Sequence, residues 1–297
     1  MTDFGYFLVP NSSDPLVGYA QLADRLGLDL IGIQDHPYQR AYVDTWTLLS
    51  VIAASTGRVT VFPDVASLPL RNPAVLAKAA ASLDLLSGGR VALGLGAGAF
   101  WDAIDAYGGP RRTPKEALGS LDEAITVIRA IWSGGRDLRF EGEHFHLRGA
   151  QAGPRPAHDM GIWLGVGGPL ALELLGRRAD GWLPSSTWAT PGKLAVMNTR
   201  IDEAALEAGR RPSDIRRLYN VNGVISTGAS QGFLNGPVDQ WVEELTDLTV
   251  GYGVDGFLLW AEGDQVEQIT RFAEEVVPEV RIQVELEGRG GAGKSPG

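Results

Sequence analysis

Short apolar segments alternate with longer amphipathic segments along most of this chain of 297 residues. The short segments are bounded by Gly, Pro, Asp or Asn, which is the pattern of β-strands buried on both faces. Eight strands are predicted in this way: Asp3–Leu8, Leu28–Gln34, Val59–Val65, Arg90–Gly96, Gly161–Gly165, Gly181–Pro184, Leu218–Ile225 and Gly256–Trp260.

Helical patterns lie between these strands. In Thr113–Trp132 the apolar residues Leu118, Leu121, Ile125 and Ile128 recur at helical spacing. The other predicted helices are Pro15–Leu26, Thr45–Ser55, Pro73–Leu86, Pro169–Arg178, Pro191–Ala208, Pro237–Tyr252 and Asp264–Val276.

Strands that alternate with helices predict a parallel sheet with right-handed crossovers. Eight such units favour an α/β fold of the (β/α)8 TIM-barrel type, with an open doubly wound sheet as the alternative. We expect one domain over residues 1–286. The segment Asp137–Leu147 predicts a small β-hairpin inserted after the fourth unit, and residues 287–297, rich in Gly, Lys, Ser and Pro, predict a disordered tail.

Composition narrows the class of protein. The chain has no cysteine, so disulfides, thiolate metal sites and thiol nucleophiles are excluded. This composition is compatible with a location in the reducing cytoplasm. The first residues show no basic region before an apolar run, and no apolar stretch approaches the roughly 18 residues of a membrane helix. A net charge of -10 disfavours nucleic acid and anionic membranes as partners. We expect a cytoplasmic protein that acts on a small molecule.

Candidate chemistry follows the second to fifth predicted strands, because a parallel barrel carries its active site at the carboxyl ends of its strands. The four clusters begin at Gln34, Pro63, Gly94 and Gly165. If the fold is a barrel, all four meet at one mouth.

Two of these clusters are rich in glycine. Gly165–Pro169 precedes a helix, where backbone N–H groups and the helix N-terminus bind phosphate, although an ordinary tight turn has the same composition. Gly94–Gly98 is an incomplete dinucleotide fingerprint, and a flat ring passing close to the backbone explains its small residues equally well.

Histidine and aromatic side chains complete the candidate site. His36 lies beside Asp35 at a strand end, where it is a candidate proton donor or simply a histidine satisfied by its neighbours. We expect Tyr38, Trp101 and Trp188 to line a substrate pocket. His144 and His146 have the alternating spacing of one strand face, but no third ligand is evident, so no metal site is predicted.

Four longer stretches, taken together, are far more specific than any single motif. They are Leu68–Lys78, Ala81–Gly98, Phe140–His144 and Ala179–Trp182. In this order they resemble the bacterial luciferase-like oxidoreductase family, over roughly Asp3–Trp260. The resemblance is greatest to the branch that uses coenzyme F-420, a 5-deazaflavin, and relatives that use FMN share much of the pattern.

The resemblance implies a barrel whose mouth holds the cofactor ring. His36 matches the residue that faces the ring and the substrate. Asp64 and Val65 match a bulge that often contains a non-prolyl cis peptide supporting the ring. The other implied cofactor-binding positions are Ala97 and Gly98 against the ring, Asp102 at its polar edge, and Gly167 and Gly168 at the phosphate.

The sequence departs from the family at two of these positions. Sugar-phosphate dehydrogenases of the F-420 branch carry a catalytic glutamate where this chain has Ala99, which argues against sugar-phosphate oxidation. The bulge residue is usually small, whereas here it is Asp64, whose charge would be unfavourable beside a reduced flavin. The carboxyl group would therefore be protonated, point away from the ring, or bond to the backbone.

The resemblance leads to three hypotheses. The first is hydride transfer between reduced F-420 and a small organic substrate, with His36 as donor or orienting group. The second is an FMN-dependent monooxygenase, and the third is a relative that binds flavin without catalysis. Relatives are often dimers, so a homodimer is expected, and Arg71, Arg177 and Arg178 are candidates for the anionic tail of F-420.

Overall fold

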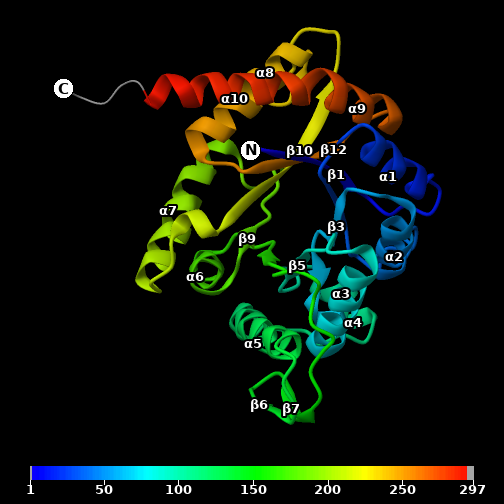
Figure 1. The fold of residues 1–297 in the computed structure, drawn as a ribbon, viewed down its shortest axis with the longest axis vertical. Coiled ribbons are helices and arrows are strands. Elements are labelled where there is room, and N and C mark those ends of the chain that lie inside the picture. Colours follow the sequence, from blue (N-terminus) through cyan, green and yellow to red (C-terminus); the bar gives the residue numbers. More distant parts are fainter. Residues whose placement is uncertain (1, 293–297) are drawn as a thin grey trace.

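The computed structural model describes residues 2–292, and side chains as far as Glu287. Eight parallel strands alternate with helices around a central barrel (Figure 1). All eight strands coincide with predicted ones, to within a few residues at their ends. They are β1 (Asp3–Leu8), β2 (Leu30–Ile33), β3 (Thr60–Pro63), β5 (Leu93–Gly96), β8 (Ile162–Leu164), β9 (Gly181–Trp182), β10 (Arg216–Ile225) and β12 (Gly256–Ala261).

The sheet closes on itself. Its strand order is β3-β2-β1-β12-β10-β9-β8-β5, and the short strand β4 (Ala66–Ser67) pairs with β5. Between β3 and β5 the ring is completed by a parallel bridge from Val61 to Val91, in which the Val61 N–H donates to the Arg90 carbonyl at 3.0 Å. Closure confirms the TIM barrel and excludes the open doubly wound sheet.

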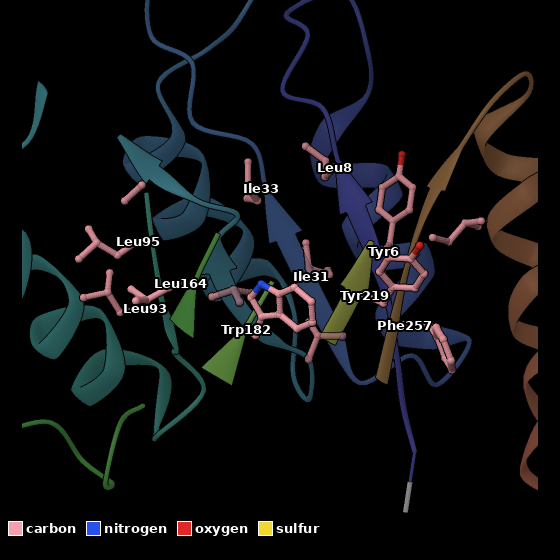
Figure 2. Packing of buried hydrophobic residues seen from close by; sticks show 14 of the residues in the cluster. Tyr6, Leu8, Ile31, Ile33, Leu93, Leu95, Leu164, Trp182, Tyr219 and Phe257 are labelled. Atoms are coloured by element: carbon pink, nitrogen blue, oxygen red, sulfur yellow. The ribbon is translucent and has the colours of Figure 1, made fainter. Parts of the chain in front are cut away.

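Each strand sends alternate side chains to two separate cores. One set faces outward and packs under the helices; Figure 2 shows Tyr6, Ile31, Leu93 and Leu164 among them. The other set fills the barrel itself and includes Phe7, Leu30, Phe62, Trp163, Leu183, Leu218 and Leu258. Because both faces of each strand are buried, the strands appear in the sequence as continuous apolar runs.

The eight predicted helices are confirmed. Capping explains several of their bounds: the Asn72 side chain accepts from two N–H groups of the first turn of α3, and Thr113 with Glu116 forms a capping box at α5. The helices are α1 (Leu16–Arg25), α2 (Thr45–Ser55), α3 (Pro73–Ser87), α5 (Pro114–Trp132), α6 (Pro169–Arg178), α7 (Pro191–Glu207), α8 (Val238–Tyr252) and α9 (Gln265–Arg271).

The sequence patterns did not predict several short elements, or the last helix. These are the 3-10 turns η1 (Leu68–Leu70) and η2 (Pro212–Asp214), helix α4 (Trp101–Ala106), strand β11 (Asn235–Gly236) and helix α10 (Val277–Ala292). The second part of the predicted helix Asp264–Val276 is a π-helical turn, η3 (Phe272–Val276).

The predicted disordered tail, residues 287–297, was wrong for its first part. Helix α10 packs against α8 and continues to Ala292, while residues 293–297 lie outside the described residues (Figure 1). Once packing has formed the first turns, each further residue adds a hydrogen bond at little cost, so composition alone does not stop the helix.

The predicted hairpin insertion is present after α5, the helix of the fourth unit. Strands β6 (Leu138–Glu141) and β7 (His146–Ala150) pair antiparallel. The expectation that His144 and His146 share a strand face was wrong. The Glu123 carboxylate accepts from the backbone N–H of His144 and from both neighbouring N–H groups, which holds His144 in the turn before β7.

Candidate active site

A cavity of about 380 Å³ opens at the carboxyl ends of β2, β3, β5 and β8. The four clusters expected to meet at one mouth therefore do converge. Seven of the predicted site residues line the cavity: His36, Tyr38, Val65, Ala97, Gly98, Gly167 and Gly168.

The floor of the cavity is made by Val65 together with Gly96 and Gly165. The Asp64–Val65 peptide is cis, as the resemblance implied. The Val65 side chain lies against Gly94, Gly96 and Gly165 at the ends of β5 and β8, and a Cβ atom added to Gly96 would lie 2.7 Å from Val65 Cγ2. These positions need glycine because the Val65 side chain occupies the space, and the result is a small apolar floor suited to a flat ring.

His36 and Tyr38 form the polar wall of the cavity. His36 Nδ1 lies 2.5 Å from the Tyr38 hydroxyl oxygen. Burial lowers the pKa of His36, although the nearby Asp35 carboxylate opposes this, and burial raises the pKa of Tyr38 to about 12. At neutral pH the phenol therefore keeps its proton. A phenol that donates to Nδ1 would leave the neutral imidazole with its hydrogen on Nε2.

A buried ion pair holds the segment that carries His36. The Asp35 carboxylate accepts from Arg71 Nε at 2.6 Å, from Arg71 Nη2 at 2.7 Å and from the Ser67 N–H at 2.9 Å. Burial opposes the charge on Arg71, but the hydrogen bonds to Asp35 and Asp44 outweigh it and raise the pKa of Arg71. The guanidinium thus ties the end of β2 to β4 and η1.

The other end of the cavity is the start of α6. Gly168 is the N-cap, no side chain caps the helix there, and open space surrounds the position where a Cβ would be. A Cβ on Gly167 would lie 2.6 Å from Trp188 Cζ3, so the backbone and the indole are in close contact. An uncapped, accessible helix N-terminus with small residues fits a phosphate group.

Four predicted site residues do not line the cavity. Asp64 points into the barrel interior, towards Gly32. Asp102 is exposed and forms an ion pair with Arg111, while Trp101 packs against Gly98 and Trp188 against Gly167.

The arginines considered for an anionic tail are paired with carboxylates. Arg71 binds Asp35 and Asp44, Arg177 lies 3.9 Å from Glu173, and Arg178 lies 2.8 Å from Asp122. Among the described residues, none that lines the cavity is Lys or Arg.

The sequence reasoning missed several residues at this mouth. The Phe100 ring meets the His36 imidazole edge-on, with centroids 5.3 Å apart, and is 58% exposed. Ser67 and Pro114 line the cavity, and so does Ala171 in α6. Thr113 is the N-cap of α5, and Pro114 is the first residue of that helix. This capping pattern in the sequence could have indicated that Pro114 begins a helix at the cavity.

These features test whether a flavin-type cofactor fits. The small residues of the floor leave room for a flat ring, the imidazole offers a hydrogen-bonding group, and the start of α6 has no side-chain cap that would compete with a phosphate. The fit is good for the ring and the phosphate. Within residues 2–292 no group of three or more His, Asp or Glu side chains is arranged to hold a metal ion. No helix in this described part is both long and apolar enough to cross a membrane.

A closed eight-stranded barrel with a cavity at the carboxyl ends of its strands is the architecture of TIM-barrel proteins, whose active sites lie at that end. The family model described as luciferase-like monooxygenase matches residues 3–230, and the chain belongs to this family.

Curated relatives share about a third of their aligned residues with this chain. It is 32% identical over 214 residues to the F-420-dependent glucose-6-phosphate dehydrogenase of Intrasporangium calvum, covering 69% of this chain and 64% of the relative. It is 34% identical over 217 residues to the 5,10-methylenetetrahydromethanopterin reductase of Methanolobus tindarius, covering 71% and 62%. The chain thus spans somewhat less than two thirds of the length of these relatives.

Solved structures share the fold at lower identity. An F-420-dependent secondary alcohol dehydrogenase, in complex with an F-420–acetone adduct, superimposes with a TM-score of 0.83 at 21% identity, covering 94% of this chain and 99% of that one. A monooxygenase from Streptomyces bottropensis superimposes with a TM-score of 0.77 at 20% identity, covering 93% and 99%. These likenesses concern the architecture.

Proposed function

We propose that this protein is an oxidoreductase that transfers hydride between coenzyme F-420 and a small, uncharged organic substrate. The observation that carries the proposal is the cavity lined by Val65 with the glycines it contacts and by the half-buried His36. The names of the curated relatives, which are F-420-dependent dehydrogenases and a reductase, support it.

The side chains of the cavity have distinct roles in this proposal. A deazaflavin supplies or accepts the hydride when it is bound. Val65 would support the ring, and the α6 N-terminus would hold its phosphate. His36 Nε2–H donates to the substrate oxygen or nitrogen on which negative charge develops, while the Tyr38 hydroxyl fixes the imidazole through Nδ1.

The residues that line the cavity argue against a sugar phosphate as the substrate. Ala99 stands where the family's sugar-phosphate dehydrogenases carry a catalytic glutamate, and it lines the cavity together with Ala97. Among the described lining residues no cation is available to pair with a phosphate on the substrate. The chemistry therefore fits a small carbonyl, imine or enone.

FMN is a second candidate cofactor. The family description and the monooxygenase neighbours favour it, and so does the absence of Lys and Arg among the described lining residues, because F-420 has an anionic oligoglutamate tail. In that case the activity would be a monooxygenase reaction with reduced flavin and O₂.

Titration of the purified protein with each cofactor, followed by cofactor fluorescence, separates the two candidates. We expect saturable binding of F-420 and weaker or no binding of FMN. Turnover of a panel of enones, imines and aldehydes with bound F-420 then shows that the protein is catalytic rather than a cofactor-binding relative. Binding of FMN alone would contradict the F-420 proposal.

We infer that the protein is a homodimer whose contact is formed by α2 and α3. Helix α2 has no charged residue, and a groove of about 480 Å³ lies between the two helices. Val51, Val75 and Leu86 on these helices are 46%, 68% and 86% exposed. A second copy of the same surface is the partner we propose, because a two-fold contact pairs one apolar patch with itself.

Replacing Leu86 by Asp should convert this dimer to a monomer. The new carboxylate would be buried in an apolar contact without a partner of opposite charge. The dissociation constant of the dimer should therefore rise about 100-fold or more. Sedimentation of Leu86→Asp measures this, with Val196→Asp on α7, also strongly exposed, as the matched control. A wild-type monomer would contradict the inference.

We place the protein in the cytoplasm as part of the same proposal. The absence of cysteine among its 297 residues is compatible with a reducing compartment.

A further inference from the structure

A carboxyl group lies inside the barrel directly behind the cavity floor. Asp64 precedes Val65, and its side chain points inward: a Cβ added to Gly32 on β2 would lie 2.9 Å from Asp64 Oδ2 and 2.9 Å from Leu258 Cδ2. Asp64 is 7% exposed, and Asn220 on β10, its hydrogen-bonding neighbour, is 4% exposed. The mechanism above does not use this pair.

Two oxygen atoms of the pair lack hydrogen-bond donors. Among the described residues, neither Asp64 Oδ2 nor Asn220 Oδ1 has a partner. Both atoms are acceptors when the carboxyl is ionised, so they cannot satisfy each other in that state, and unpaired buried polar atoms are costly. A proton on the carboxyl removes its charge, and with it most of the cost of burying a carboxylate oxygen that has no donor.

The environment of Asp64 favours the neutral acid. Barrel-filling neighbours on the surrounding strands are uncharged: Phe7 on β1, Leu183 after β9 and Leu258 on β12. Charged and titratable groups follow the surrounding strands at this end of the barrel. They are Asp35 and His36 after β2, with Asp35 paired to Arg71, and Glu262 and Asp264 after β12. Burial raises the pKa of Asp64 to about 7, although the hydrogen bond with Asn220 opposes the shift.

We propose that Asp64 and Asn220 form a proton-holding pair beneath the cavity, and that binding of the anionic cofactor is coupled to uptake of a proton at Asp64. The second part rests on the proposed cofactor site. A negative ligand placed above Val65 disfavours a second negative charge behind it, so the bound state keeps Asp64 neutral at a pH where the free protein has partly lost its proton.

The free protein tests the first part. Carbon-13 NMR of labelled aspartate carboxyls should show one group that titrates near neutral pH and is missing from Asp64→Asn. The Asn220→Ala variant should shift that midpoint upwards, because it removes the hydrogen bond that favours ionisation. A midpoint near 4 for Asp64 would overturn the proton-holding pair.

Calorimetry in buffers of different ionisation enthalpy tests the coupling, with F-420 and with FMN. At pH 7.5 wild-type protein should take up a measurable fraction of a proton more than Asp64→Asn. Between pH 6.5 and 8.5 the affinity of the wild-type protein for the cofactor should fall about tenfold more than that of Asp64→Asn. A shift of one unit in the pKa of Asp64 on binding corresponds to a factor of ten. The variant Asp105→Asn removes an exposed carboxylate from α4 at the same mouth and should behave as wild type.

The possible outcomes separate the two proposals. Equal proton uptake by wild type and Asp64→Asn would overturn the coupling while leaving the proposed cofactor site intact. If neither cofactor binds, both the proposed function and the coupling fail, and the NMR titration still decides whether Asp64 holds a proton.

Discussion

Replacing His36 by alanine should lower turnover by roughly 10²- to 10⁴-fold, which is the usual contribution of a positioned acid or base. Cofactor affinity should change little, because the floor at Val65 and the α6 N-terminus are untouched. The imidazole lines the described cavity beside the Tyr38 hydroxyl, and in the proposed mechanism its Nε2–H donates to the substrate.

The measurement is the steady-state rate together with a cofactor titration of the same sample. His146→Ala is the matched control, because this histidine lies in the β7 hairpin beside Glu141 and should leave both quantities unchanged. Turnover of His36→Ala equal to that of wild type would remove His36 from the mechanism.

The pH profile provides a further check within the same experiment. Burial, partly opposed by Asp35, lowers the pKa of His36 below its ordinary value of 6.5. The neutral imidazole is therefore the main form above pH 6.5, and wild-type activity should decline only as the pH falls below that value. The small residual activity of His36→Ala should lack this acidic limb.

Replacing Arg71 by methionine should lower the free energy of unfolding by about 3–5 kcal/mol, as expected when one partner of a buried ion pair is removed. The Asp35 side chain is 1% exposed and would keep only the Ser67 N–H as a donor. The segment carrying His36 should loosen as well, so turnover should fall together with stability.

Urea denaturation of Arg71→Met measures the effect. Arg111→Met is the control, because its ion pair with Asp102 is exposed and such pairs contribute about 1 kcal/mol or less. In the double variant Asp35→Leu with Arg71→Met no buried charge is left unpaired, and much of the stability should return. A loss below about 1 kcal/mol in Arg71→Met would show that Asp35 is satisfied without the guanidinium.

The two departures from the family pattern have different consequences. Ala99 widens the cavity and removes a carboxylate, which affects the choice of substrate. Asp64 leaves the floor itself unchanged, because Val65 forms it, and places its carboxyl in the barrel interior. Of the alternatives considered from the sequence for this carboxyl, the structure shows that it points away from the cavity.

The sequence by itself determined the architecture of this protein. Strands buried on both faces must be apolar throughout, and helices over a barrel must be amphipathic, so the alternation of the two patterns along the chain is sufficient for eight units. Capping side chains in the sequence also determined where helices begin, as Asn72 does for α3 and Thr113 for α5. The family motifs indicated the cis peptide before Val65 and the glycines that approach it.

Only the tertiary structure decided which side chains meet at the mouth. Phe100 reaches His36, Asp35 pairs with Arg71, and Asp64 faces Asn220 across the barrel, and these partners lie 64, 36 and 156 positions apart in the sequence. Asp102, which the resemblance places at the cofactor, forms an exposed ion pair with Arg111 in this structure. The direction of a side chain depends on the backbone at its own residue and on the space its neighbours leave, and neither is encoded in the periodicity of the chain.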